Sequence, residues 1–186
     1  MDLEAIDRAV TTYLNGLSGH VPALDSIMVI VTGYGAFAIV AAVAIRWWWN
    51  GSADKLRERH LAILCGLSVA LGLAMNQGIL LLVHRMRPYD AGVTHLLIAR
   101  SADPSFPSDH ATLAFAVVFA LLGAGARRGW GFLVAAVVLA CSRVYVGTHY
   151  ASDILGGALT GLIAAIICLA LVKQDSRFTE LAARIL

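Results

Sequence analysis

The stretch SRVYVGTHYASDILGGALTGLIAAIICLALV, residues 142–172, contains both kinds of sequence from which the chain is built. Its second part, Ile154 to Val172, carries no charge and is long enough to cross the hydrocarbon core of a bilayer, which takes about 20 helical residues. Its first part, Ser142 to Asp153, brings an arginine, a histidine and an aspartate to the edge of that segment. The chain therefore joins a membrane-spanning helix to a strongly polar segment.

The same alternation continues toward the N-terminus. Four more apolar segments predict spans, at residues 26–45, 61–83, 111–126 and 130–146. Ser108 is a good N-cap for the helix that follows it, and Ser152 and Asp153 are N-cap residues for the last span. Within that span, the small pair Gly157 and Gly161 suits close helix packing.

The first twenty residues are amphipathic and acidic, unlike a cleavable signal peptide. Apolar residues recur there at helical spacing, which predicts a helix lying in the membrane interface. They are Ile6, Val10, Tyr13, Leu14 and Leu17. We therefore expect an all-α, polytopic membrane helical bundle of about five transmembrane helices plus this N-terminal helix, forming one domain over residues 1–186.

The composition excludes several other classes of protein. With 59% apolar and 14% charged residues, the chain cannot be an ordinary soluble domain. A net charge of +2 gives no reason to expect a nucleic-acid partner. Cys65, Cys141 and Cys168 are far apart in apolar segments, so we expect buried small hydrophobic side chains rather than a disulfide or a metal site. The oligomeric state is not indicated by the sequence.

Counting the crossings assigns the polar segments to two faces. One face receives most of the basic residues, nine of the fourteen. These are Arg46, Lys55, Arg57, Arg59, Arg127, Arg128, Lys173, Arg177 and Arg184. The positive-inside rule makes that face cytoplasmic, so the other polar face is expected to look outward from the cell.

The outward face collects residues that suit phosphate chemistry. Arg87 and Arg143 offer planar forks of donors for phosphate or carboxylate oxygens. Ser108 begins a helix, where a hydroxyl and free N–H groups favour an anion. Ionisable side chains at a membrane boundary are costly and usually serve function.

Two histidines add a nucleophile and a proton donor to that face. His149 lies four residues before Asp153, so a carboxylate can hold one ring nitrogen and leave the other as nucleophile or base. His110 could then act as the proton donor opposite it. Structural capping, headgroup contacts by the arginines and a structural histidine hydrogen bond remain the alternatives for each residue taken singly.

Three motifs resemble the signatures of the type 2 phosphatidic acid phosphatase (PAP2) superfamily. They are RP at Arg87-Pro88, PSDH at Pro107 to His110 and SRVYVGTHYASD at Ser142 to Asp153, and they lie in a core of about residues 60–172. The variant PSDH is similar to that of small bacterial undecaprenyl-pyrophosphate phosphatases of the bacitracin-resistance type.

The resemblance implies a role for each matched residue. Arg87, Ser108 and Arg143 would hold the phosphate oxygens, and His149, oriented by Asp153, would attack phosphorus. His110 would protonate the leaving group and then help to activate water. The implied enzyme is a lipid phosphatase that works through a phosphohistidine without cofactor or metal, on undecaprenyl pyrophosphate or on phosphatidylglycerol phosphate or phosphatidic acid.

The chain departs from the family pattern at two positions. Leu80 stands where the family usually has a lysine, and His84 and Arg85 are further candidates to supply that cation. Asp109 stands where many members have glycine, and is a further candidate to adjust the proton affinity of His110.

Two other classes of function remain open. A lipid transporter or scramblase would bind a phosphate with the same arginines but has no need of the histidine and aspartate set. A metallohydrolase would use His110, Asp109, His149 and Asp153 as ligands, at a spacing that matches no zinc pattern.

Overall fold

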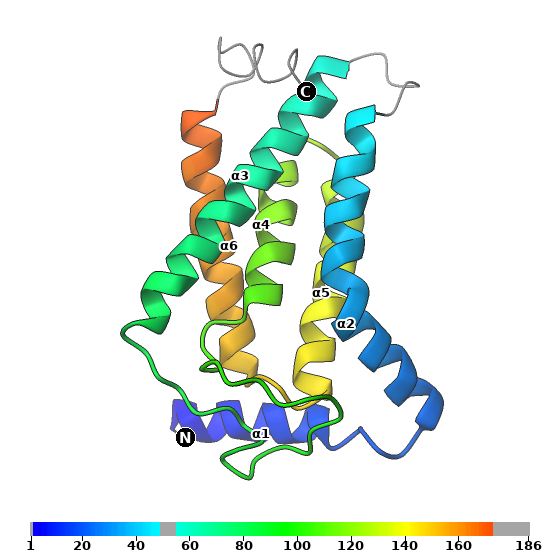
Figure 1. Ribbon diagram of the computed structural model, residues 1–186, viewed down its shortest axis with the longest axis vertical. Coiled ribbons are helices and arrows are strands. Elements are labelled where there is room, and N and C mark those ends of the chain that lie inside the picture. Colours follow the sequence, from blue (N-terminus) through cyan, green and yellow to red (C-terminus); the bar gives the residue numbers. More distant parts are fainter. Residues whose placement is uncertain (1, 49–54, 173–186) are drawn as a thin grey trace.

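A computed structural model describes residues 2–48 and 55–172. The described residues form six α-helices and one short 3-10 helix. In chain order these are α1 (Leu3–Asn15), α2 (Pro22–Ile45), η1 (Arg46–Trp48), α3 (Lys55–Leu80), α4 (Asp109–Gly123), α5 (Gly129–Tyr145) and α6 (Ala151–Leu171). Helices α2 to α6 form an upright bundle, and α1 lies across one end of it (Figure 1). The predicted all-α bundle is confirmed.

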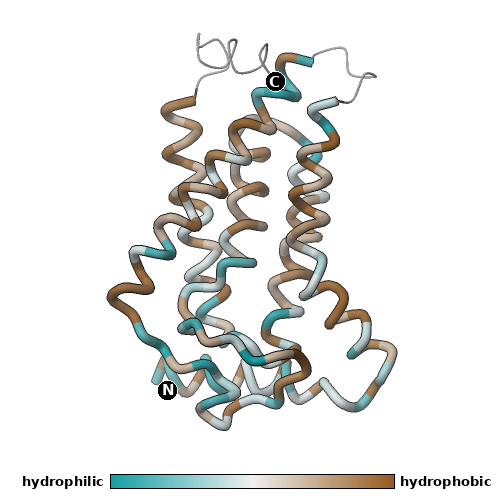
Figure 2. The backbone as a smooth tube through the Cα atoms, in the orientation of Figure 1, coloured by the Kyte–Doolittle hydropathy of each residue, from teal (hydrophilic) through white to brown (hydrophobic). Residues whose placement is uncertain are grey.

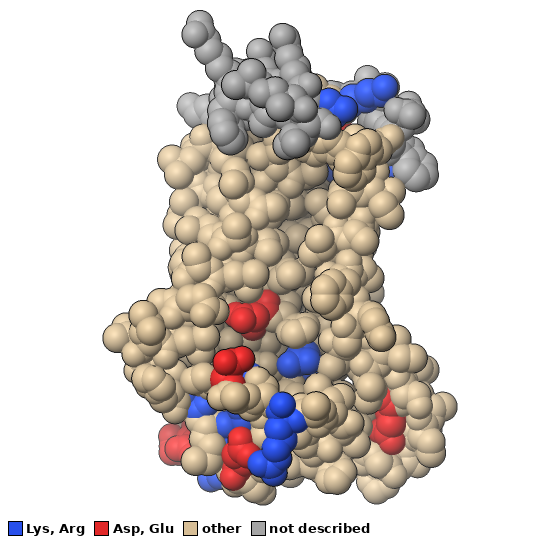
Figure 3. Space-filling view, viewed as in Figure 1, with Lys and Arg blue, Asp and Glu red and all other residues tan. Residues whose placement is uncertain are grey.

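Three of the helices, α2 with η1, α3 and α6, are long and apolar enough to cross a membrane, and α4 and α5 are shorter apolar helices. Figure 2 shows apolar residues along these helices and polar residues at the two ends of the bundle. Figure 3 shows a wide uncharged belt between charged groups at the two ends. The chain is a multi-pass membrane protein.

Helix boundaries differ from the predicted spans where polar residues continue a helix. α3 begins at Lys55, six residues before the predicted Leu61, because the intervening charged residues are good helix formers. α3 also ends at Leu80 rather than at Val83. α2 begins at Pro22, since a proline is well tolerated in the first turn, where its missing N–H is not needed.

Helix α4 is the centre of the bundle and packs against α3, α5 and α6. Gly157 and Gly161 on α6 face the backbone of α4: a Cβ at Gly157 would lie 2.5 Å from the carbonyl oxygen of Ser108, and one at Gly161 would lie 2.8 Å from that of Thr112. The predicted close packing at these glycines is confirmed. Of the three cysteines, Cys65 and Cys168 are buried, whereas Cys141 is exposed on α5, so the expectation of burial is wrong there.

The basic end of the bundle is held by one carboxylate. Glu58 accepts hydrogen bonds from Arg46 (3.3 Å) and Arg128 (2.6 Å), which joins η1, α3 and the start of α5. These residues share one end, as the crossing count predicts. Lys173, Arg177 and Arg184, which belong to the same prediction, lie outside the described residues.

Helix α1 presents its apolar side chains outward and a polar face to the bundle. Leu3 and Tyr13 are 83% and 72% exposed, as an interfacial helix requires, whereas Thr11 and Asn15 are buried. Asn15 Nδ2 donates to the carbonyl oxygens of His95 and Tyr145, both at 2.8 Å, and its Oδ1 accepts from the His95 N–H. Helix α1 is therefore fixed to the polar end by its face opposite the exposed apolar one.

Candidate active site

A polar cavity of about 290 Å³ opens at the end of the bundle where α1 lies. It brings together residues from α3, the segment between α3 and α4, α4, α5 and the connection between α5 and α6. The lining side chains are Gln77, Leu80, Arg87, Ser101, Asp103, Pro104, Pro107, Asp109, His110, Arg143 and His149. Four of the six principal predicted residues therefore line this cavity or border it directly: both arginines and both histidines.

The Arg87 guanidinium is held from behind by backbone oxygens. Its Nε donates to the carbonyl oxygen of Asp103 at 2.8 Å, and its Nη1 donates to that of Thr148 at 3.1 Å. Because neutral carbonyls rather than a carboxylate hold this buried cation, its charge is not neutralised in place. Arg87 is thus oriented and still able to attract an anion.

Arg143 and Ser108 carry polar atoms with no protein partner among the described residues. Arg143 Nε and Ser108 Oγ are both buried and make no hydrogen bond. Ser108 occupies the N-cap position of α4, as predicted, but its hydroxyl makes no capping hydrogen bond. A buried donor without a partner costs about 1–3 kcal/mol, and such groups therefore call for a ligand.

His149 is buried, and one of its ring nitrogens is fixed by the backbone. Nδ1 lies 2.8 Å from the carbonyl oxygen of Ser105 and 3.5 Å from Oδ2 of Asp153. A carbonyl oxygen can only accept, so Nδ1 carries the proton and Nε2 keeps its lone pair. The orienting group predicted for His149 was Asp153, whereas the closer contact is a carbonyl that no side-chain pattern could reveal.

Burial lowers the pKa of His149, and the nearby Arg143 and Arg87 lower it further against the opposing effect of Asp153. A lowered pKa favours the neutral imidazole at neutral pH. The neutral ring with a protonated Nδ1 is the form in which Nε2 is a nucleophile.

Asp153 is fully buried and serves several neighbours at once. Its Oδ2 accepts from the Tyr150 N–H at 2.8 Å, and its Oδ1 accepts from Nη1 of Arg85 at 2.7 Å. Asp153 is the third residue of α6, not its N-cap, because the helix begins at Ala151 after the cap Tyr150. The predicted cap role is therefore replaced by a capping box in which Asp153 binds the cap residue's own N–H.

The backbone turn before His149 requires a glycine. Gly147 has φ of 85°, a conformation that L side chains rarely adopt, and a Cβ there would lie 2.3 Å from the carbonyl oxygen of His95. The Thr148 hydroxyl closes the turn by donating to the carbonyl oxygen of Arg143 at 2.8 Å. The turn therefore fixes the spacing between Arg143 and His149 in the cavity.

Asp109 accepts a hydrogen bond at 2.7 Å from Nδ2 of the buried Asn76 on α3. The same amide group donates to the hydroxyl of Thr112 at 2.8 Å. Sequence reasoning did not identify Asn76, although an asparagine inside an apolar helix was a usable signal. His110 follows Asp109 and borders the cavity on the same turn of α4.

The structure shows where Leu80 and the two candidates to replace the missing lysine lie. Leu80 lines the cavity, so an apolar side chain stands there in place of the expected cation. His84 is exposed, and Arg85 is turned toward Asp7 and Asp153; neither lines the cavity. Among residues 2–48 and 55–172, no three His, Cys, Asp or Glu side chains are grouped so as to hold a metal ion.

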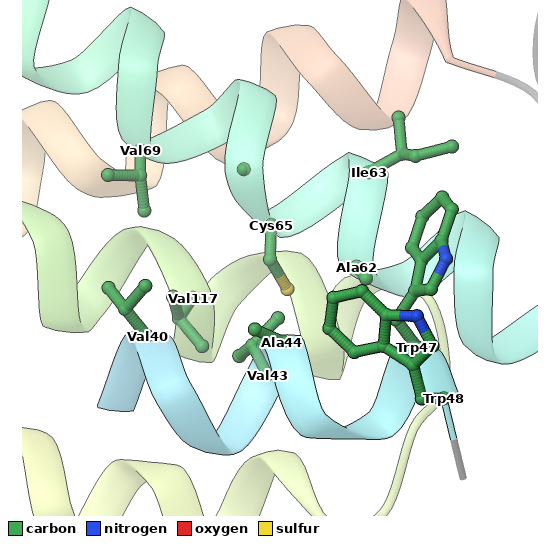
Figure 4. Close-up of a pocket in the computed structure, with 11 residues that line it drawn as sticks. Val40, Val43, Ala44, Trp47, Trp48, Ala62, Ile63, Cys65, Val69 and Val117 are labelled. Atoms are coloured by element: carbon green, nitrogen blue, oxygen red, sulfur yellow. The ribbon is translucent and has the colours of Figure 1, made fainter. Parts of the chain in front are cut away.

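A separate apolar cavity of about 320 Å³ lies near the basic end of the bundle, between α2 and α3 (Figure 4). Val43, Trp47, Ile63 and Cys65 are among its lining residues. None of the described residues that line it is an acid, a base or a cation. The described arginines and histidines suited to phosphate chemistry line the polar cavity instead.

Known proteins are similar to this chain in sequence. Residues 61–177 match the model of the PAP2 superfamily. The chain is 34% identical over 172 residues to undecaprenyl-diphosphatase BcrC of Bacillus subtilis, covering 92% of this chain and 87% of that protein.

Two solved structures share the fold. One is a transmembrane PAP2-type phosphatidylglycerolphosphate phosphatase from Bacillus subtilis, with a TM-score of 0.68, 22% identity, and coverage of 94% of this chain and 88% of that one. The other is LpxE of Aquifex aeolicus, with a TM-score of 0.72, 21% identity, and coverage of 91% and 99%.

Proposed function

The chain belongs to the PAP2 superfamily of membrane lipid phosphatases, and from that premise we propose that it hydrolyses undecaprenyl diphosphate to undecaprenyl phosphate and inorganic phosphate. The observation that carries the proposal is the arrangement of His149 in the polar cavity. Its Nδ1 is tied to the Ser105 carbonyl, while an unpaired Arg143 and an unpaired Ser108 belong to the same end of the bundle. The chain's similarity to BcrC favours an isoprenyl diphosphate as the substrate.

In the first step, Nε2 of His149 attacks the terminal phosphorus. The N–P bond forms as the P–O bond to the lipid phosphate breaks, and His110 supplies the proton to the departing oxygen. Arg87, Arg143 and the Ser108 hydroxyl hold the three remaining oxygens of the phosphoryl group, where charge is spread in the transition state. The N–H groups of the first turn of α4 add to this field.

In the second step, water attacks the phosphohistidine. His110, now neutral, takes a proton from the water, the new P–O bond forms, and the N–P bond breaks. Inorganic phosphate leaves, and His149 returns with Nδ1 still bonded to the Ser105 carbonyl. Every proton and phosphoryl transfer in these steps involves only the protein, the substrate and water, so the proposed mechanism needs no metal ion.

An apolar cavity that adjoins the polar cavity supports a lipid as the substrate. It has about 660 Å³, is lined by apolar residues of α2, α3 and α4 such as Phe37 and Leu73, and shares Asp109 and His110 with the polar cavity. An acyl or isoprenyl chain in this groove would bring its phosphate to His110. A transporter that only binds phosphate would not require the fixed tautomer of His149.

The test of the function is phosphate release by the purified protein in detergent. Wild type is expected to prefer undecaprenyl diphosphate over phosphatidylglycerol phosphate and phosphatidic acid, and His149→Ala is expected to release no phosphate while keeping the wild-type elution profile. A preference for a glycerol lipid would replace the substrate assignment. Turnover by His149→Ala would refute the nucleophile.

We also propose that the polar end faces the cell exterior, because six of the nine predicted inside cations lie within the described residues at the opposite end. Ala99 is exposed in the segment between α3 and α4. In a Cys141→Ala background, Ala99→Cys is expected to react with a membrane-impermeant thiol reagent on intact cells. Reaction only after lysis would reverse the orientation.

A further inference from the structure

The arginine at position 85 joins the interfacial helix to the carboxylate beside His149. Its Nη2 donates to Oδ2 of Asp7 on α1 at 2.7 Å, and its Nη1 donates to Oδ1 of Asp153 on α6 at 2.7 Å. The guanidinium also lies over the ring of Tyr150, with its carbon 3.9 Å from the ring centroid. One cation thus contacts three elements of the polar end.

Asp7 binds the same region a second time. Its Oδ1 accepts from the Ser152 N–H at 2.8 Å, and its Oδ2 accepts from the Ser152 hydroxyl. That hydroxyl in turn accepts from Nη1 of Arg85 at 2.6 Å. The first turn of α6, which carries Asp153, is therefore tied to α1 through both backbone and side chain.

Two further residues on the same face of α1 also form hydrogen bonds with this region. Thr11, one turn after Asp7, accepts from the Ala151 N–H at 3.0 Å, and Asn15, one more turn along, binds the Tyr145 carbonyl. Residues spaced by four lie on the same face of a helix. This polar face consequently follows the connection between α5 and α6 from one end to the other, with His149 in the middle.

Arg85 does not line the polar cavity, so it cannot contact the phosphate directly. Its effect must pass through Asp153, which is fully buried and would otherwise be an uncompensated charge 3.5 Å from His149. On the proposed function, we infer that Arg85 and Asp7 are positioning residues: they hold Asp153 and the first turn of α6 so that His149 stays neutral and aimed into the cavity.

Four titratable or charged side chains lie around His149. They are Arg87 after α3, His110 on α4, Arg143 on α5 and Asp153 on α6. Removing the Arg85 cation leaves Asp153 free to stabilise a protonated His149. The pKa of His149 should then rise, and the acid limb of kcat should move to higher pH. A role in folding alone would lower the active fraction without moving that limb.

The experiment compares Arg85→Gln and Asp7→Asn with matched controls on the outer face of α1. Arg8 and Glu4 form an exposed pair at 3.9 Å, so Arg8→Gln and Glu4→Gln remove the same kinds of charge without removing a hydrogen bond to α6. For Arg85→Gln we expect kcat to fall by about tenfold to a hundredfold with KM within about twofold, as for other groups that orient a catalytic side chain. Asp7→Asn is expected to have a smaller effect in the same direction, and both controls to match wild type.

Two further variants distinguish positioning from folding. Arg85→Lys keeps the charge but cannot bind both carboxylates as a fork, so we expect an intermediate kcat with the acid limb unmoved. The double variant of Arg85→Gln with Asp7→Asn is expected to be no slower than Arg85→Gln, because the two residues act through one network. Equal kcat and an equal acid limb in wild type and Arg85→Gln would overturn the inference.

A second measurement is independent of turnover. In histidine-labelled protein, the imidazole resonance missing from His149→Ala reports His149, and its titration should move to higher pH in Arg85→Gln. Should wild type release no phosphate from any lipid, the proposed function fails and this titration still decides the inference. Should Arg85→Gln fail to fold, the same titration in Asp7→Asn decides it, and an unmoved His149 resonance overturns it.

Discussion

Replacing Gly157 with alanine is expected to push α6 away from the start of α4 and so to disturb the site from its supporting side. The added Cβ would lie 2.5 Å from the Ser108 carbonyl oxygen, 2.9 Å from the Ala111 Cβ and 3.1 Å from the Thr112 nitrogen. Ordinary contact begins near 3.4 Å, so the two helices must separate by about 0.9 Å. Two of the three obstructing atoms belong to the backbone and the third is an alanine Cβ, so none can move aside by a rotamer change.

This displacement acts on stability and on catalysis. Overpacking of this kind costs about 1–3 kcal/mol. Ser108, whose N–H donates to the Asp153 carbonyl at 3.1 Å, shifts relative to the first turn of α6. Because a misplacement of about 1 Å can cost about a hundredfold in rate, we expect kcat to fall by about tenfold to a hundredfold.

The control is Gly66→Ala on α3, where no atom lies within 4 Å of the added Cβ. Alanine is favoured over glycine inside a helix by about 1 kcal/mol in both variants, so the difference between them isolates the overpacking. Thermal unfolding in detergent and phosphate release would be measured side by side. We expect Gly66→Ala to unfold at or above the wild-type temperature, and Gly157→Ala below it by about 2–4 °C per kcal/mol. Wild-type unfolding and kcat in Gly157→Ala would refute the packing argument.

Three shorter predictions concern the cavity itself. Gly147→Ala is expected to unfold at a lower temperature and lose phosphate release, because its φ of 85° costs an alanine about 1–2 kcal/mol and its Cβ meets the His95 carbonyl; wild-type unfolding would contradict this. Arg143→Gln is expected to lower kcat/KM by about a hundredfold to a thousandfold in the phosphate-release assay, because in the proposed mechanism its unpaired donor binds the phosphoryl group in the transition state. Burial lowers the pKa of His149, so its imidazole is expected to stay neutral below the ordinary histidine pKa of about 6.5. We therefore expect kcat to stay constant as the pH falls through about 6.5 and to decrease only at lower pH. An acid limb of kcat above about pH 6.5 would oppose the assignment of His149 as nucleophile.

The fold was predictable because the length of an apolar segment, and the residues that start and end a helix, are local features of the sequence. The uncharged segments give the spans, and the small pair Gly157 and Gly161 gives the tightest helix contact. The boundaries were less accurate at Lys55, since charged helix formers extend a helix beyond the bilayer without any apolar signal.

The site was predictable to the extent that side chains carry it. The motifs named Arg87, His110, Arg143 and His149, and the structure brings these four to one cavity. The Ser105 carbonyl that fixes the His149 tautomer is a backbone group, which every residue type offers equally. Sequence reasoning therefore predicted four side chains that share one cavity, and it predicted Asp153 beside His149, but it could not predict the backbone carbonyl that lies closer to the His149 ring.

The polar face of α1 was missed for a different reason. The helical periodicity of α1 is set by its apolar side chains. Asp7, Thr11 and Asn15 therefore look like residues of the solvent-facing side of an interfacial helix. Their partners lie 78 to 145 residues away in the sequence. No local pattern can reveal contacts of that separation.

That separation also bears on how the protein is made. During translation, α1 emerges long before the backbone groups of Tyr145 and Ala151 that its polar face binds. Its exposed apolar face gives it a place at the membrane surface in the meantime, with the polar face still hydrated. The contacts that hold α1 over the connection between α5 and α6 can therefore form only after Ala151 has been synthesised.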